Sequence, residues 1–133
     1  YNSRGGAYID LGQYERAIED YDEVIRLDPK DAYAYNNRGL AYRLLGQYER
    51  AIEDLNEAIR LDPQYVYAYN NRGLAYGNLG QYERAIEDYD EAIRLDPKDA
   101  YAYNNRGLAY RNLGQQELAD RDFAKAEELG YNP

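Results

Sequence analysis

The chain lacks several residue types on which enzymes and cofactor sites depend. Its 133 residues include no Cys, no His, no Met and no Trp. Without Cys, neither a disulfide framework nor a thiolate metal site can form. Ser3 is the only serine, so the usual pairs of nucleophile and neutral base are missing as well. No loop has the spacing of a calcium hand. We therefore expect no enzyme activity, no cofactor and no metal site.

Long apolar runs and an excess of basic residues are also missing. No segment approaches the roughly 18 consecutive apolar residues of a membrane span, and no N-terminal stretch resembles a secretory signal. The formal net charge is −9, whereas nucleic acids and anionic lipids attract clustered Lys and Arg. We expect a soluble protein that binds neither nucleic acid nor membranes. The compartment stays open, with the cytoplasm favoured.

What the chain has in abundance is repetition. Residues 66–99 repeat residues 32–65 almost unchanged, which gives a period of 34 residues. Glycines and prolines recur at the same interval, as Gly39, Gly73 and Gly107 and as Pro29, Pro63 and Pro97. A fixed period in this range indicates a solenoid built from one supersecondary element.

Apolar spacing predicts that each unit is a hairpin of two helices. Tyr35, Gly39, Tyr42 and Leu45 lie on one stripe of a first helix over residues 32–45. Gly46 follows this stripe, where a left-handed residue ends a helix. A second apolar stripe then begins at residue 48 and stops at residues 62–63, because the residue before proline avoids the helical region.

Single residues within the hairpin have predicted structural roles. Asp31 and Asp99 are placed to cap first helices with their carboxylates, whereas Tyr65 at the equivalent position cannot. Gly39 lies inside a helix, where glycine costs about 1 kcal/mol relative to alanine. We expect it to allow close approach of the second helix at Ala51 and Ala58.

These residues resemble the tetratricopeptide repeat family. Its pattern of aromatic, small and proline positions matches the second unit at Tyr35, Gly39, Tyr42, Ala51, Leu55, Ala58 and Pro63. The resemblance implies an all-α fold, a right-handed superhelical solenoid of helix-turn-helix repeats, and a role in protein–protein interaction. One departure is arginine where the family usually has leucine, at residues 38, 72 and 106. We expect each guanidinium to reach a carboxylate of a neighbouring unit.

The period divides the chain into a single array of four repeats: 1–31, which is N-terminally truncated, then 32–65, 66–99 and 100–133. The last repeat is predicted to be a polar cap. Gln116, Asp120 and Glu127 stand there in place of the apolar residues that inner repeats use for stacking, Tyr82, Ile86 and Ile93. The first repeat keeps the apolar residues Ala7, Ile9 and Leu11. We expect this face to be covered by preceding sequence of a longer protein or by a second copy of the chain.

Charged residues of the second helices are interpreted as a solvated surface. Glu49, Glu53, Asp54 and Glu57 alternate there with arginines at spacings that allow local ion pairs.

The candidate site lies on the first helices, outside their packing stripe. In the family these helices line a concave groove, so the resemblance implies that these residues contact a peptide. The candidate residues are Tyr33, Asn36, Asn37, Leu40 and Arg43, then Tyr67, Asn70, Asn71 and Leu74, and finally Tyr101, Asn104, Asn105, Leu108 and Arg111. Gly77, at the position of Arg43 and Arg111, is predicted to leave a gap in the groove floor.

Two interpretations of these asparagines remain open. An amide offers a donor and an acceptor to a peptide backbone, and Asn37, Asn71 and Asn105 resemble the asparagine ladder of protein O-linked N-acetylglucosamine transferases. The match to carboxylate-clamping cochaperones is poor, because Tyr33 and Asn36 stand where lysine is expected. Alternatively, the asparagines are solvated or bond to the next unit and set its stacking.

Two functions are therefore weighed. The first is a protein-interaction module that binds an extended peptide or a helix of a partner in the concave groove. The second is a structural scaffold, or an engineered array of consensus-like repeats without a selected ligand, that self-associates through its uncapped N-terminal face. Variation between repeats in the groove favours a selected ligand.

Overall fold

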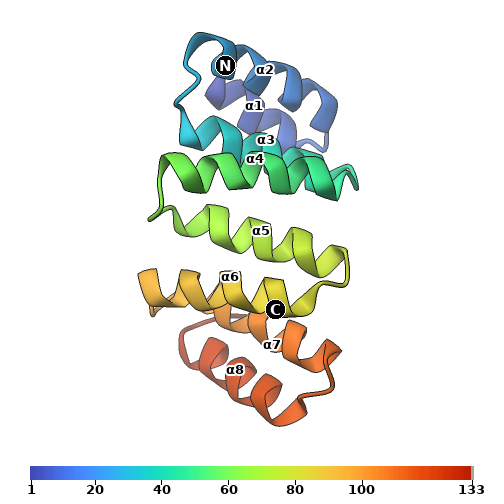
Figure 1. Cartoon of the computed structure of the whole chain (residues 1–133), viewed down its shortest axis with the longest axis vertical. Coiled ribbons are helices and arrows are strands. Elements are labelled where there is room, and N and C mark those ends of the chain that lie inside the picture. The colour runs from blue at the N-terminus through green and yellow to red at the C-terminus, as the bar shows by residue number, and fades with distance from the viewer. Residues whose placement is uncertain (133) are drawn as a thin grey trace.

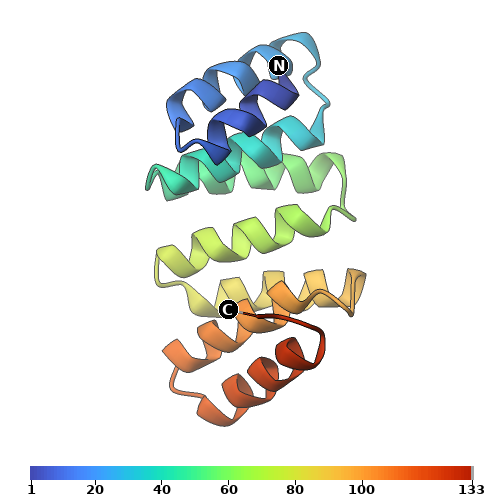
Figure 2. The same cartoon turned by 180° about the vertical axis from the view of Figure 1, so that it is seen from behind.

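The computed structural model describes residues 1–132, and these residues form eight helices and no strand. The helices are α1 (Asn2–Asp10), α2 (Tyr14–Leu27), α3 (Ala32–Leu44), α4 (Tyr48–Leu61), α5 (Val66–Asn78), α6 (Tyr82–Leu95), α7 (Ala100–Asn112) and α8 (Gln116–Glu128). They pair into four antiparallel hairpins, stacked in one row from the N-terminal to the C-terminal end (Figures 1 and 2). Pro133, the last residue of the predicted fourth repeat, lies outside the described residues.

The helix ends follow the predicted signals. The Asp31 carboxylate accepts a hydrogen bond of 3.1 Å from the backbone N–H of Ala34, and Asp99 caps α7 in the same way. Tyr65 makes no such bond at the start of α5. Gly46 ends α3 with a φ of 81°, a left-handed conformation that L side chains rarely adopt.

Gly39 allows the two helices of its hairpin to approach closely, as predicted. A Cβ atom at this position would lie 2.9 Å from Leu55 Cγ and 3.2 Å from the Ala51 carbonyl oxygen. The nearest atoms thus belong to Leu55 and Ala51 and not to Ala58.

The buried face of the first helices differs from the prediction. On α3 the fully buried apolar residues are Ala34 and Ala41, whereas Tyr35, Tyr42 and Leu45 are only half-buried. The reason is that α3 packs on two sides, against α4 of its own hairpin and against α2 of the preceding one. Small side chains fill the second contact, whereas Tyr35 and Tyr42 pack on the buried cluster of α4 and α5.

Each hairpin also contains an ion pair between an arginine and a buried aspartate. Arg38 donates from Nε and Nη2 to the two carboxylate oxygens of Asp54, at 2.8 and 2.7 Å, and Asp54 is only 6% exposed. The prediction that Asp54 is solvated is therefore wrong, although Glu49 and Glu53 are exposed. The same bidentate geometry recurs in the pairs Arg4–Asp20, Arg72–Asp88 and Arg106–Asp122.

The expected contact with a neighbouring unit is a secondary one. Arg38 donates from Nη1 to Asp22 of the preceding hairpin at 2.9 Å, and Arg106 does the same to Asp90. Arg72 instead meets the amide oxygen of Asn56. The arginines thus bind mainly the carboxylate of their own hairpin.

The two ends of the row differ in polarity. On α8, Gln116, Asp120 and Glu127 are exposed, and Gln116 donates a hydrogen bond of 2.7 Å to Asp120. At the other end, Ala7 and Leu11 are exposed. Among the described residues, every helix is too short and too polar to cross a membrane.

Candidate functional site

The first helices of the hairpins lie on the inner side of the array. Successive first helices contact one another, from α1 to α3, α5 and α7, whereas within residues 1–132 no two second helices do. The row therefore curves, with successive first helices closer together than successive second helices. This curvature makes the surface of α1, α3, α5 and α7 the inner face of the molecule.

Most of the predicted site residues are accessible on this inner face. Tyr33, Tyr67 and Tyr101 are 49%, 71% and 69% exposed, which is high for large aromatic side chains. Arg111 is exposed as well, and the half-buried members are Asn37, Leu40, Arg43, Asn71, Leu74, Asn104, Asn105 and Leu108.

Asn36 and Asn70 do not lie open on the inner face, which corrects the prediction for these two residues. They are only 4% and 9% exposed. Asn36 accepts a hydrogen bond of 3.0 Å from Asn71 of the next repeat, and Asn70 donates one of 2.6 Å to Asp99. Of the two interpretations of the asparagines, a hydrogen bond to the next repeat therefore applies to Asn36 and Asn70. A buried polar side chain needs such partners, since leaving it unpaired costs free energy.

The bonding of these asparagines changes where a capping carboxylate is missing. Asn2 donates to Asp31 at 3.3 Å, and Asn70 donates to Asp99. At the boundary between the second and third repeats the equivalent residue is Tyr65, which has no carboxylate. There the bond from Asn71 to Asn36 joins α5 to α3 instead.

Three hollows bring inner-face residues together. The first, of about 530 Å³, includes Tyr33, Asn37 and Leu40 and lies where Gly6 replaces the leucine of the other repeats. The second, of about 160 Å³, lies between α5, α6 and α7 and includes Leu74, Asn105 and Leu108. The third, of about 590 Å³, lies at α7 and α8 and includes Asn104, Leu108 and Arg111.

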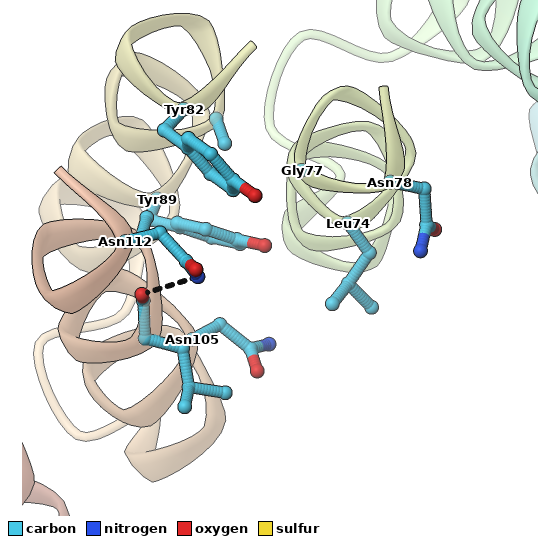
Figure 3. Close-up of a pocket in the computed structure, with 10 residues that line it drawn as sticks. Leu74, Gly77, Asn78, Tyr82, Tyr89, Asn105 and Asn112 are labelled. Carbon is cyan, nitrogen blue, oxygen red and sulfur yellow. Dashed lines mark hydrogen bonds between the residues drawn. The ribbon is translucent and has the colours of Figure 1, made fainter. Parts of the chain in front are cut away.

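The second hollow lies at the predicted gap beside Gly77. Figure 3 shows the rings of Tyr82 and Tyr89 extending from α6 toward α5, with Leu74 facing them across the opening. The sequence prediction missed Tyr82, Tyr89 and Asn112 as lining residues, because they were assigned to helix packing or to repeat variation. Burial raises the pKa of Tyr89, which keeps its hydroxyl protonated and able to donate.

The predicted site residues carry a charge opposite to that of the whole protein. On α3, α5 and α7 the predicted site holds two charged residues, Arg43 and Arg111, and no carboxylate. Within residues 1–132 neither guanidinium has a carboxylate within ion-pair distance. Arg43 donates to Asn78 at 3.4 Å, and burial lowers its pKa because the charged form loses solvation.

The geometry offers groups that are suited to binding. Groups of acidic side chains that could hold a metal ion do not occur among the described residues. Four helical hairpins with an open, amide-rich and tyrosine-rich inner face define a helical-repeat solenoid of the kind that binds other proteins.

The comparisons with known proteins identify the family. Models of the tetratricopeptide repeat match residues 5–45, 39–80, 66–99 and 88–121. The chain belongs to the tetratricopeptide repeat family, whose right-handed superhelical solenoid serves protein–protein interaction. A comparison with curated proteins gives no match.

Solved structures of the same fold are similar over nearly the whole chain. A crystal structure of MamA is 36% identical, with a TM-score of 0.86, and the match covers 94% of this chain and 73% of MamA. The first repeat domain of human RPAP3 is 31% identical, with a TM-score of 0.83, over 87% of this chain and 91% of that domain. A further structure shows the first repeat domain of RPAP3 bound to the HSP90 peptide SRMEEVD, at 31% identity and a TM-score of 0.81, over 85% and 90% of the two chains.

Proposed function

We propose that the inner face of the four-repeat array binds an extended peptide segment or a helix of a partner protein. The observation that carries this proposal is the row of exposed tyrosines, Tyr33, Tyr67 and Tyr101, on a face that the stacking of the helices leaves open. Tyrosine offers rigid contact area together with a hydroxyl group, and such residues are enriched in binding surfaces.

The asparagines beside these tyrosines supply polar contacts. Asn37, Asn71 and Asn105 are half-buried, and Asn71 also donates to Asn36 of the preceding repeat. A side-chain amide has two N–H donors and a carbonyl acceptor, so even Asn71 keeps a donor and an acceptor for an extended backbone.

The charge of the inner face favours an acidic ligand. Arg43 and Arg111 lack a carboxylate partner within the described chain, and a ligand carboxylate would neutralise them. The peptide bound to the first RPAP3 repeat domain, SRMEEVD, is itself rich in acidic residues.

A second candidate is a scaffold that self-associates at its N-terminal hairpin. The observation in its favour is the exposure of Leu11, which is 69% exposed beside the exposed Ala7. A partner that covers this surface would bury apolar area there. Sedimentation at rising concentration tests it, and a constant monomer would count against it.

The binding function is tested with a peptide array probed by the wild-type protein and by a triple variant, Asn37→Ala, Asn71→Ala and Asn105→Ala. We expect peptides that bind the wild type to lose most of their signal with the triple variant. A matched control changes three exposed amides outside the inner face to alanine, Gln47, Gln81 and Gln115. Binding that survives the asparagine changes, or is lost equally in the control, would contradict the proposal.

A further inference from the structure

The third repeat has an opening that its neighbours fill with an arginine. The position of Gly77 is occupied by Ile9, Arg43 and Arg111 in the other repeats. Arg43 reaches across to Asn78 on the next first helix, and the Arg111 guanidinium lies 5.7 Å from the centre of the Phe123 ring. At Gly77 no atom lies within 4 Å of the place where a Cβ would stand.

The walls of this opening are mainly carbon. Leu74 lies opposite the rings of Tyr82 and Tyr89 (Figure 3), and Leu108, Ala85 and Ala109 also line the hollow. Three amides lie among them: Asn112 donates to the backbone oxygen of Leu108 at 2.9 Å, Asn78 accepts from Arg43 at 3.4 Å, and Asn105 is the third. Because carbon predominates in the walls, the hollow favours an apolar group over a polar one.

The size of the hollow limits what can enter it. Its volume is about 160 Å³. An apolar cavity of about 150 Å³ is known to accept benzene, so the hollow has room for one leucine or phenylalanine side chain and not for a helix.

The two arginines on either side of the hollow indicate the charge of the flanking ligand residues. Arg43 and Arg111 lie one repeat before and one repeat after Gly77, on the same inner face. A segment that crosses all three positions meets a cation, then an apolar hollow, then a second cation.

We propose that the hollow at Gly77 receives a single leucine or phenylalanine side chain from a bound peptide whose flanking residues are acidic. The inference rests on the proposed peptide-binding function. It adds that Gly77 determines specificity, because the arginine that the second and fourth repeats have at this position would close the hollow.

The hollow is tested first without a peptide, with toluene as the probe. Amide-resolved NMR spectra of the wild type should shift at Gly77, Leu108 and Asn112 as toluene is added. Gly77→Arg restores the residue of the second and fourth repeats, so it should fold and lose these shifts. The control Gln64→Arg adds the same charge at an exposed residue just before α5, outside the hollow and outside the predicted site, and it should keep the shifts. Absence of shifts in the wild type, or their persistence in Gly77→Arg, would overturn the proposal.

The second test uses acidic peptides that differ only in one central residue, Leu, Phe, Ala or Ser. The wild type should bind the Leu and Phe peptides at least about tenfold more tightly than the Ala and Ser peptides, as expected for burying one large apolar side chain. Gly77→Arg should abolish this preference, whereas the control Gln64→Arg should keep it. Peptides that bind without any preference would overturn the inference and leave the proposed function standing. Toluene binding without any peptide binding would instead refute the peptide-binding function and the proposal that depends on it.

Discussion

Each hairpin buries one aspartate carboxylate, which is hydrogen-bonded to an arginine sixteen residues earlier in the sequence. Asp88 is 4% exposed, and both of its oxygens accept hydrogen bonds from Arg72. Removing two charges from water is costly, and the bidentate bonds offset that cost only while both partners are present. Because Arg72 also bonds to Asn56, the same side chain joins two hairpins.

The first prediction concerns this pair. Arg72→Leu introduces the residue that the family usually has, but it leaves Asp88 buried without a partner. We expect the free energy of unfolding to fall by about 3 kcal/mol, measured by chemical denaturation. The control Arg94→Leu removes an arginine that is paired with Glu91 at the surface, where the arginine side chain is 66% exposed, and it should change stability by less than about 1 kcal/mol.

The double variant Arg72→Leu and Asp88→Leu tests whether the loss of stability comes from the unpaired charge of Asp88. If the loss comes from an unpaired buried charge, the double variant should recover most of it. Equal stability of Arg72→Leu and the wild type would contradict the structural importance of the pair.

Single residues were the hardest features to predict from the sequence. Asp54 follows Glu53 among the polar residues of α4, so its local pattern is that of a solvated residue. Its burial depends on Arg38, which lies on another helix. The constant spacing of sixteen residues between arginine and aspartate in all four repeats was the signal that could have revealed it.

At the scale of the helix, α5 carries two glycines with opposite roles. A Cβ on Gly73 would lie 2.6 Å from the Tyr89 ring, whereas one on Gly77 would meet nothing within 4 Å. The first glycine is needed for packing. The second is not needed for packing and weakens the helix, because glycine loses more conformational freedom on folding than alanine does.

The second prediction compares the same substitution at these two positions. Gly77→Ala should raise the free energy of unfolding by about 1 kcal/mol, since it improves helix propensity without a clash. Gly73→Ala should lower it by about 1 to 2 kcal/mol, because overpacking outweighs the gain in propensity. Thermal and chemical unfolding of both variants provide the measurement. If both variants were more stable than the wild type, α5 and α6 could move apart without a loss of stability, which would contradict the packing role of Gly73.

The helices themselves were predictable from the sequence because local signals determine them. Asp31, Gly46 and the Asp62–Pro63 pair mark starts and ends within a few residues of the chain. The buried face of α3 was less predictable, since Ala34 packs on the preceding hairpin. The apolar stripe that the spacing predicts for one hairpin does not show the contact with the preceding hairpin. For the same reason, Asn36 and Asn70 were assigned to the groove although they lie between repeats.

At the scale of the whole molecule, α8 differs from the second helices of the inner repeats because its outer surface is polar. Inner repeats place Tyr82, Ile86 and Ile93 against the next hairpin, where they pack with buried residues. The last repeat exposes Gln116, Asp120 and Glu127 instead. Stacking of another hairpin there would bury these polar groups without partners, which is unfavourable.

The third prediction is that restoring the inner residues makes the chain associate. The triple variant Gln116→Tyr, Asp120→Ile and Glu127→Ile should present an apolar end, and its sedimentation coefficient should rise with concentration. Contacts between two different ends do not close, so larger assemblies are expected as well as dimers. The control Glu117→Ile changes another exposed residue of α8 and should sediment as the wild type does. Identical sedimentation of the triple variant and the wild type would contradict the capping role.

The contacts between first helices, without matching contacts between second helices, give the molecule a mechanical character. If small rotations occur at the contacts between first helices, they add up along the row and change the pitch of the array. A ligand that spans several repeats would then restrict these rotations along the whole array and not only in the repeats it touches.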